Sequence, residues 1–433
     1  MSQPEPALNP SNTQRRTERT IVLILAAVQF TSIVDFMVVM PLGTQLMRTL
    51  HIGPREFGFI VSSYTFAAGA AGLIASSIVD RFSRRAAFLT LYAGFLVGTF
   101  LCALAPTYAT LLAARVITGA FGGILGGMSM AIIGDEFPEE RRGQATGIMM
   151  SGFALASVAG VPAGLSLGTA YGWHVPFVCL VVLGSPILVV SALNMPRLDS
   201  HLGKAHTHPL RSLADTFSEP NHLNAFALII SLMIGAFAVI PYISDYLLAN
   251  VGVPEKQLPF VFIAGGAFTL IAAPLAGKIA DRRGKLFVYR AIIPISAILL
   301  IVVTHLPPVA TAVAVLIVAT LMVSNACRMV VAMAMVTGSV RRDRRGSFMS
   351  ANASVQHFST GIGACFGGFI IQKLPDLRLV NFGIVGWIAV AVTLTSLWFA
   401  GRVKIVDDSA AEPESLAAAA EANCDLGEPL VGA

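Results

Sequence analysis

Apolar residues follow one another along this chain in runs of about twenty, separated by short stretches that hold most of the charges. A helix needs about 20 residues to cross roughly 30 Å of hydrocarbon, so each run predicts a membrane span. The runs lie near residues 20–42, 56–79, 86–105, 108–134, 143–170, 174–195, 223–249, 258–280, 286–305, 309–338, 346–373 and 379–401. We therefore expect an all-α membrane protein with twelve transmembrane helices, arranged as two six-helix halves around a central cavity.

Composition agrees with this pattern and excludes other classes of protein. Hydrophobic residues make up 55% of the 433 residues and charged residues 12%, too few polar groups to cover a soluble protein of this length. A β-barrel would show short alternating strands instead of long runs. The net charge of +5 is small, and the five cysteines lack paired spacing. We expect no nucleic-acid partner, disulfide framework or bound metal.

The placement of lysine and arginine predicts the orientation in the membrane. If the N-terminus is cytoplasmic, 22 of the 29 Lys and Arg residues fall in cytoplasmic segments, 5 in outside segments and 2 within spans. Cytoplasmic loops carry such an excess, so both termini are expected in the cytoplasm. The first span is too long for the apolar core of a cleavable signal.

The same pattern predicts how the chain divides into domains. The predicted parts are an N-tail (1–19), a first half (20–195), a cytoplasmic central loop (196–222), a second half (223–401) and a C-tail (402–433). The tail is acidic, rich in alanine and poor in bulky apolar residues, which predicts disorder.

Two charged loops recur about 200 residues apart. Residues 80–81 and 281–282 both read Asp-Arg, and residues 142–143 and 345–346 both read Arg-Gly. A repeat with an even number of spans gives two parallel halves, with a site between them near the membrane midplane. The repeat therefore predicts a secondary transporter.

The second copy of the Asp-Arg loop has the form Gly-x-x-x-Asp-Arg-x-Gly-Lys and resembles the loop signature of the Major Facilitator Superfamily. The first copy keeps its charges but has Ser76 and Ser83 in place of the glycines. The candidate residues are Asp80, Arg81, Arg84, Arg85, Gly277, Asp281, Arg282, Gly284 and Lys285. They can act as topology signals, as a solvated turn, or as a conformational latch in which the aspartate meets the N-terminal end of a helix from the other half.

Spans 1, 4 and 5 carry further resemblances. "RVITGAFGG", with Arg115 and Gly119, resembles the family's Arg-x-x-x-Gly element. Gly160, Pro162 and Gly164 resemble the antiporter element of span 5, which is normally richer in glycine. "IVDFMVVMPLG" in span 1 is similar to efflux members. Together these resemblances imply a drug:proton antiporter with twelve spans.

Glycine also recurs every four residues along span 4. Gly119, Gly123 and Gly127 share one face of the predicted helix. Small residues on one face let membrane helices approach closely, so we expect a packing surface here.

Asp35 and Arg115 each lie within an apolar span. A charge at a helix centre costs about 2.5–3.5 kcal/mol on insertion scales, so each needs a partner or a wet cavity. In the resembled fold spans 1 and 4 both line the cavity, which would let the two residues meet. We interpret Asp35 as the proton carrier and Arg115 as its charge partner. The alternative is a permanent ion pair that holds the helices together.

Other polar residues within spans are candidates for the substrate cavity. They are Gln29, Thr31, Ser32, Tyr242, Asp245, Asn325, Arg328, Asn352, Gln356 and His357. Arg328 can act in gating, contact an anionic substrate group or extend to the membrane interface. His357 can titrate near neutral pH or form part of the packed interior. Asp245 lies near the end of its span, so the outer mouth is its other possible place.

These observations together predict function. We expect a secondary transporter that works by alternating access and exports a small amphipathic or drug-like compound in exchange for protons. Proton-coupled uptake, sugar or metabolite export, a facilitator and a non-transporting membrane sensor are the alternatives. We expect no enzyme, because the phosphate-loop, HExxH and GxSxG patterns are missing.

The expected setting follows from this function. We expect no cofactor, with the proton gradient as energy source, and as partners only the substrate, protons and the lipid bilayer. The chain is expected to be a monomer that crosses the cytoplasmic membrane of a bacterium many times.

Overall fold

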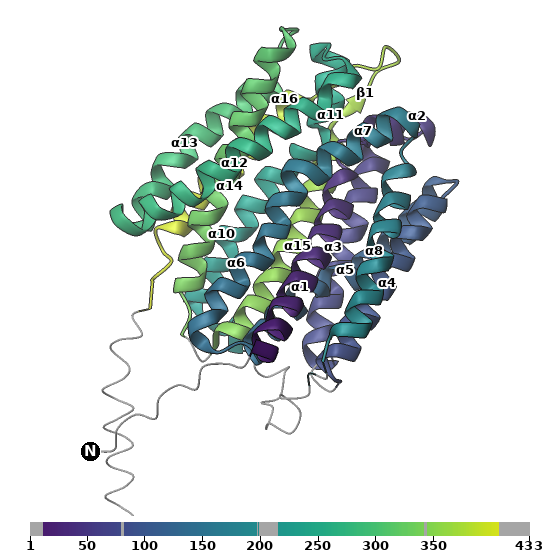
Figure 1. Ribbon diagram of the computed structural model, residues 1–433. Helices are drawn as coiled ribbons and strands as arrows, with labels where there is room; N and C mark the ends of the chain where they lie inside the picture. Colours follow the sequence, from purple (N-terminus) through teal and green to yellow (C-terminus); the bar gives the residue numbers. More distant parts are fainter. Residues whose placement is uncertain (1–11, 79–81, 197, 199–214, 342–343, 407–433) are drawn as a thin grey trace, which may run out of the picture.

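The structure is a computed structural model that describes residues 12–78, 82–196, 198, 215–341 and 344–406 (Figure 1). The helices of its first part are α1 (Asn12–Val38), α2 (Gly43–Thr49), α3 (Pro54–Ile78), α4 (Arg84–Leu104), α5 (Tyr108–Glu136), α6 (Glu139–Leu155), α7 (Val161–Tyr171) and α8 (Val175–Asn194). Those of its second part are α10 (Pro220–Phe237), α11 (Ile243–Tyr246), α12 (Leu258–Arg283), α13 (Lys285–Thr304), α14 (Thr311–Gly338), α15 (Arg345–Ile370) and α16 (Phe382–Ala400). The one sheet within this described part pairs β1 (Gln372–Lys373) with β2 (Leu379–Val380) in antiparallel register.

The predicted all-α membrane fold with two halves is confirmed. Among the described residues, eleven helical stretches are long and apolar enough to cross a membrane, and each overlaps one of the runs predicted above. The twelfth predicted span is α15, which is less apolar because of polar residues such as Asn352 and Gln356. It packs between α3 and α10, inside the bundle, where a polar face need not meet lipid.

Short links join the long helices. α12 and α13 are separated by a single residue, Gly284, whose φ of 93° lies in the region that favours glycine. α12 extends to Arg283, so Asp281 lies in its last turn. The sequence interpretation, which put this aspartate beyond the end of the span, is therefore corrected.

The fifth span changes its helix type halfway. A π-helix (Ala156–Gly160) separates α6 from α7, and the second residue of α7 is Pro162, which cannot donate a backbone hydrogen bond. The predicted antiporter-like element thus begins at this irregular turn.

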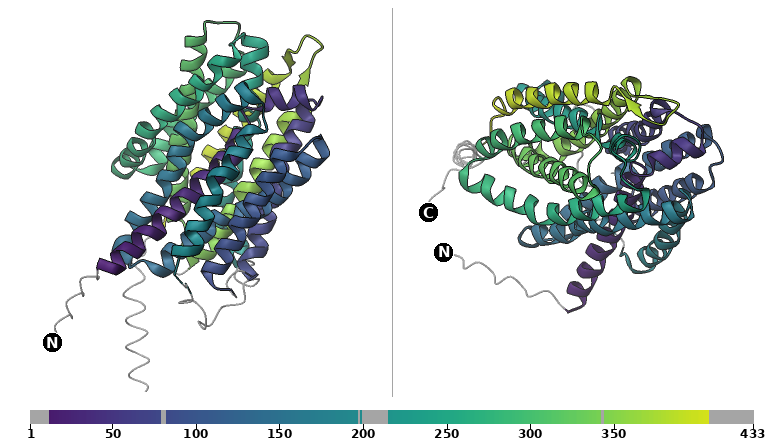
Figure 2. Two further views of the ribbon diagram at one scale, coloured as in Figure 1. Left: turned by 45° about the vertical axis from the view of Figure 1, so that its right-hand side comes forward. Right: turned by 90° about the horizontal axis from the view of Figure 1, so that it is seen from above.

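The two ends of the bundle differ. We call the end that holds the link between α12 and α13 and the start of α15 the basic end, because arginine and lysine gather there. α1 begins at the basic end, whereas α2, α11 and the β1–β2 hairpin lie at the opposite end (Figure 1). Seen along the bundle, the green helices of the second part gather mainly on one side and the purple and blue helices of the first part on the other (Figure 2).

The apolar core shows how the two halves are held together. One buried cluster at the opposite end joins residues of both halves, for example Val39 and Phe57 with Val239 and Val385. Near the basic end there are two separate clusters, one formed by the first half alone and one by the second half alone. Among the described residues, the buried apolar core is therefore continuous between the halves at the opposite end, whereas near the basic end each half has a core of its own.

Candidate functional site

Asp35 and Arg115 form a buried ion pair. Arg115 Nη1 donates to Asp35 Oδ2 over 2.7 Å, and both residues are 0% exposed. α1 supplies the carboxylate and α5 the guanidinium, so the pair joins two helices that are 80 residues apart in sequence. The predicted meeting of the two residues is confirmed, whereas their role in proton coupling stays a prediction.

Two further side chains complete this site. Thr99 Oγ1 of α4 donates to the second carboxylate oxygen, Asp35 Oδ1, over 3.1 Å. The guanidinium of Arg115 lies over the ring of Tyr64 from α3, 4.3 Å from its centroid, in a cation–π contact. The sequence interpretation missed both, because a threonine or a tyrosine within an apolar span carries no signal of its own.

The site lies toward the opposite end of the bundle. Asp35 stands three residues before the end of α1, and Val34 and Val38 beside it belong to the core that joins the halves. The pair is thus sealed behind apolar side chains in this conformation. A change of water access at Asp35 requires that the halves move apart here.

The second half has a buried arginine of its own. Arg328 of α14 is 2% exposed, and its Nη1 donates to Thr393 Oγ1 of α16 over 3.4 Å. Its Nη2 has no hydrogen-bond partner among the described residues. Asn325, one turn away, likewise has a carboxamide oxygen without a partner.

Polar residues of α15 face α14, the helix that carries Arg328. The side-chain amides of Asn352 and Gln356 lie 4.0 and 3.8 Å from the sulfur of Met333 on α14, a weak acceptor. Asn352 Oδ1 is buried without a partner. His357 is partly buried, and Phe358 next to it packs against Phe66 of α3. Asn352 thus joins Asn325 and Arg328 as a predicted cavity residue with unused hydrogen-bonding capacity among the described residues.

Of the cavity candidates on α1, two are buried inside the first half and one is partly exposed. Thr31 Oγ1 lies 3.1 Å from Tyr92 Oη, and Ser32 donates to Val28 of its own helix. Both are buried within the first half, so the structure does not place them on a cavity. Gln29 is partly exposed and its carboxamide oxygen faces Gly126 of α5.

Tyr242 and Asp245 lie at the opposite end of the bundle. Of the two places considered for Asp245, the substrate cavity and the outer mouth, the structure agrees with the second. Tyr242 Oη donates to Ala364 O over 2.7 Å. The buried carboxylate of Asp245 accepts from Lys373 Nζ over 3.4 Å. Neither side chain has the exposure expected of a cavity residue in this conformation.

Polar contacts also link the two halves at this end. Glu255 of the second half accepts from Gln45 Nε2 over 2.9 Å and forms an ion pair with Arg48 over 3.3 Å, both on α2. Cys365 Sγ of α15 donates to Ser62 Oγ of α3 over 2.9 Å. These contacts reinforce the shared apolar core.

The predicted latch residues lie at the basic end. Arg84 forms an ion pair with Asp135 over 2.9 Å within the first half, and Lys285 Nζ donates to Ala334 O over 3.2 Å within the second. Arg85 donates to Ala192 O. Asp281 is exposed.

Among the described residues, Arg282 and Gly277 of the predicted latch show no contact between the halves. Arg282 is exposed, and a side chain at Gly277 would meet Val330 of α14 in the same half. Asp80 and Arg81 lie outside the described residues. Latching between the halves stays a prediction.

Glycines in spans 4 and 5 allow close helix contacts. A side chain at Gly119 would collide with the backbone of Tyr64, and one at Gly123 with Ala68, both on α3. Gly127 differs, since nothing lies within 4 Å of the position of its missing Cβ. The predicted packing surface thus ends after Gly123.

The glycines of span 5 allow this span to pack closely against α1. A side chain at Gly160 would collide with Val34, and one at Gly164 would meet Val38 Cγ2 at 2.6 Å. The antiporter-like element therefore packs directly against the segment of α1 that carries Asp35.

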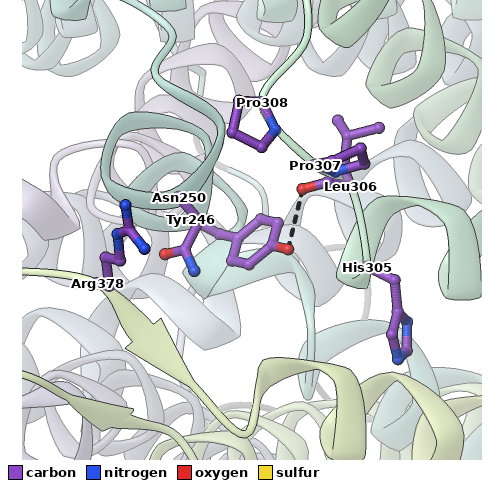
Figure 3. A pocket seen from close by; sticks show the side chains of 7 residues that line it. All are labelled: Tyr246, Asn250, His305, Leu306, Pro307, Pro308 and Arg378. Carbon is purple, nitrogen blue, oxygen red and sulfur yellow. Dashed lines mark hydrogen bonds between the residues drawn. The ribbon is translucent and has the colours of Figure 1, made fainter.

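A small pocket of about 260 Å³ opens at the opposite end, within the second half. Tyr246, whose hydroxyl donates to Leu306 O over 3.1 Å, forms one wall, with His305 and Arg378 at the sides (Figure 3). It is separate from the Asp35–Arg115 pair.

The fold defines a multi-pass membrane protein built from two helical halves. The chain matches the sequence model of the Major Facilitator Superfamily over residues 25–327 and 225–422. The protein therefore belongs to this superfamily of multi-pass membrane transporters, which is not a class of enzymes.

Curated relatives from bacteria are similar to the chain over different lengths. The transporter YbcL of Bacillus subtilis (strain 168) is 22% identical over 386 residues, covering 88% of this chain and 96% of YbcL. A protein described as a probable sugar efflux transporter of Mannheimia succiniciproducens is 23% identical, covering 88% of this chain and 92% of that protein. YtbD of Bacillus subtilis is 27% identical over 60% of this chain, and the match spans 64% of YtbD.

Solved structures show the same fold. A bacterial homologue of the human lysosomal transporter Spinster, in an inward-facing and unoccupied conformation, has a TM-score of 0.68 at 15% identity, covering 91% of this chain and 95% of that one. The peptide transporter POT has a TM-score of 0.69 at 15% identity, and the match covers 91% of this chain and 99% of that one.

Proposed function

We propose that this secondary transporter exports a small amphipathic compound from the bacterial cytoplasm in exchange for protons. The observation that carries the proposal is the buried Asp35–Arg115 pair, a titratable carboxylate inside an otherwise apolar layer. Intramembrane ionisable residues are costly, and in transporters they mark proton or substrate pathways. The resemblance of spans 1 and 5 to efflux members supports the direction.

The geometry supports a simple coupling scheme. Without a proton, Asp35 balances the charge of Arg115 and accepts hydrogen bonds on both oxygens, from Arg115 and from Thr99. With a proton, the carboxyl group is neutral and the buried guanidinium loses its counter-charge. That state is costly in an apolar layer, so protonation favours a conformation in which water reaches the pair.

The packing of the two halves supports alternating access. The core shared by both halves seals the pair at the opposite end, whereas the cores near the basic end are separate. If the basic end is cytoplasmic, as the positive-inside rule predicts, this conformation is the one that receives substrate from the cytoplasm. Opening the opposite end would then expose Asp35 to protons outside.

The test is transport in proteoliposomes with wild type and Asp35→Asn. The probes are octyltrimethylammonium, octanol and octanesulfonate, which share one chain and carry no group that titrates near neutral pH. An internal pH dye reports protons moved by each probe under an imposed pH gradient. We expect Asp35→Asn to lose gradient-driven flux while it keeps exchange of labelled probe without a gradient.

The control is Asp376→Asn, which changes a carboxylate whose side chain is 58% exposed in a loop. It should leave both fluxes unchanged. Full gradient-driven flux in Asp35→Asn would refute the role of proton carrier. Loss of both fluxes together with a lower melting temperature would instead show a permanent structural pair.

Export of a neutral, hydroxyl-rich compound is the second candidate. Asn352 and Gln356 offer amide groups whose only partner among the described residues is the sulfur of Met333. Such groups suit sugar hydroxyls, and one similar protein is described as a probable sugar efflux transporter. Competition by glucose, arabinose and lactose against octanol transport would distinguish this candidate.

A further inference from the structure

Two arginines are buried among the described residues, Arg115 and Arg328, and they differ in their charge balance. Arg115 has the carboxylate of Asp35 at 2.7 Å, the hydrogen bond between them and the ring of Tyr64. Arg328 has a single hydrogen bond, to the neutral hydroxyl of Thr393 at 3.4 Å. No acidic side chain of the described residues lies within 4.0 Å of its guanidinium. The second half therefore holds a buried positive charge without a counter-charge.

This charge cannot be relieved by the usual routes. A guanidinium stays protonated at neutral pH. Arg328 stands ten residues before the end of α14, about 15 Å along a helix axis, and its side chain is buried rather than extended toward the basic end. The interpretation that Arg328 extends to the membrane interface is therefore wrong. An isolated buried ion costs several kcal/mol, so a missing partner of opposite charge is the simplest account.

Neutral donors lie close to Arg328. Ser324, one turn earlier on α14, is 7% exposed, and its hydroxyl has no hydrogen-bond partner among the described residues. On α16, Thr393 contacts Arg328 directly, whereas the hydroxyl of Ser396 is already used, because it accepts from Tyr289 of α13 and donates to Thr393 O. Hydroxyl groups around a guanidinium are a suitable environment for an oxyanion, which accepts several hydrogen bonds at once.

We propose that Arg328 and Ser324 bind the negatively charged group of an amphipathic organic anion, such as a sulfonate or a carboxylate. The inference rests on the proposed export function and narrows its substrate class. Arg328 lies in the middle part of α14, beside Cys327 and Val331 of the core that the second half forms alone and about 15 Å from the basic end of the helix. Along the bundle, Arg328 therefore lies nearer the basic end than Asp35 does.

The first test is thermal unfolding of the purified full-length chain without probe. Arg328→Met removes a buried charge that has no counter-charge, so its Tm should rise above that of wild type. Arg115→Met removes one partner of a buried pair and leaves Asp35 alone, so its Tm should fall. A Tm of Arg328→Met below wild type would show that the protein itself already balances this charge, and would overturn the proposal.

The second test is binding, measured as the Tm shift and affinity for octanesulfonate. Wild type should be stabilised, and Arg328→Met should bind about tenfold to a hundredfold more weakly, as expected when a hydrogen bond to a charged group is lost. Arg328→Lys keeps the charge but not the paired donors and should fall between them. Ser324→Ala should weaken binding without the rise in Tm. Arg341→Met, which changes an exposed arginine with no assigned role, is the matched control and should bind as wild type does.

Three comparison ligands test whether the site at Arg328 is specific for an organic anion. Octyltrimethylammonium and octanol should stabilise wild type less than octanesulfonate, and equal shifts would overturn the anion site. Sodium chloride at the same ionic strength should give no shift, and a full shift would mean a small inorganic anion instead of a substrate. Because binding needs no proton gradient, it remains measurable even if Asp35→Asn refutes proton coupling.

Discussion

Replacing Gly119 by alanine should show how closely α3 and α5 must approach at the ion pair. The new Cβ would lie 2.8 Å from both Cα and the carbonyl carbon of Tyr64 and still closer to its carbonyl oxygen. Ordinary carbon contacts begin near 3.5 Å, so α3 has to move by more than half an ångström. Overpacking of this kind typically costs about 1–3 kcal/mol, and backbone atoms cannot yield by changing a rotamer.

Gly127→Ala is the matched control on the same helix. Nothing lies within 4 Å of its missing Cβ, so the substitution adds no clash. Both variants gain the same helix propensity, about 1 kcal/mol, which cancels when they are compared. The difference in unfolding free energy between them should therefore be about 1–3 kcal/mol, with Gly119→Ala the less stable.

The assay is reversible unfolding in mixed micelles, followed by tryptophan fluorescence, together with gradient-driven transport. Transport by Gly119→Ala should also fall, because Tyr64 carries the ring on which Arg115 rests. If the two variants differ by less than about 0.5 kcal/mol, within the range of ordinary surface substitutions, the close approach of α3 and α5 is not a constraint. The reasoning from helix packing to the ion pair would then fail.

Three other changes test separate parts of the molecule. Thr99→Val removes one donor to Asp35 and should reduce gradient-driven transport severalfold, with a stability loss of about 1 kcal/mol measured by thermal unfolding. Glu255→Gln removes the ion pair at the opposite end, so maleimide labelling of Cys365 at the contact between α3 and α15 should become faster. Asp281→Asn should slow the transport cycle in proteoliposomes without weakening the binding of probe.

Each of these predictions has its own control and its own contrary result. Thr320→Val changes an exposed threonine and should be neutral, so an equal effect there would remove the case for Thr99. Cys327, inside the second half, should label at an unchanged rate in Glu255→Gln. Faster labelling of both cysteines would indicate that the whole protein is destabilised, and not only the contact between α3 and α15. Loss of probe binding in Asp281→Asn would argue against a latch.

Much of the architecture was predictable because hydropathy is a local property. The spans at 84–104, 108–136 and 382–400 match the predicted runs within a few residues. Helix ends were less predictable, since α12 continues through Asp281 to Arg283 before Gly284 ends it. α2 and the β1–β2 hairpin were missed, because short elements at the end of a bundle depend on the neighbours that they cover.

The candidate site was predictable only in part. Two opposite charges within apolar spans indicate a pair, and Asp35 with Arg115 proved to be one. Thr31 and Ser32 carry the same kind of polarity but are buried in the first half, since sequence spacing does not say toward which neighbour a helix face is turned. Met333 gave no signal at all, although it is what the amides of α15 contact.

The sequence by itself thus determined the membrane class, the two halves and the superfamily, because long apolar runs and repeated charged loops are visible in one dimension. Only the tertiary structure decided that Arg115 is paired and Arg328 is not, and that the halves share a core at one end alone. The physical reason is that a partner for a buried charge comes from another helix. Its distance depends on how the helices are rotated and packed, which no local pattern records.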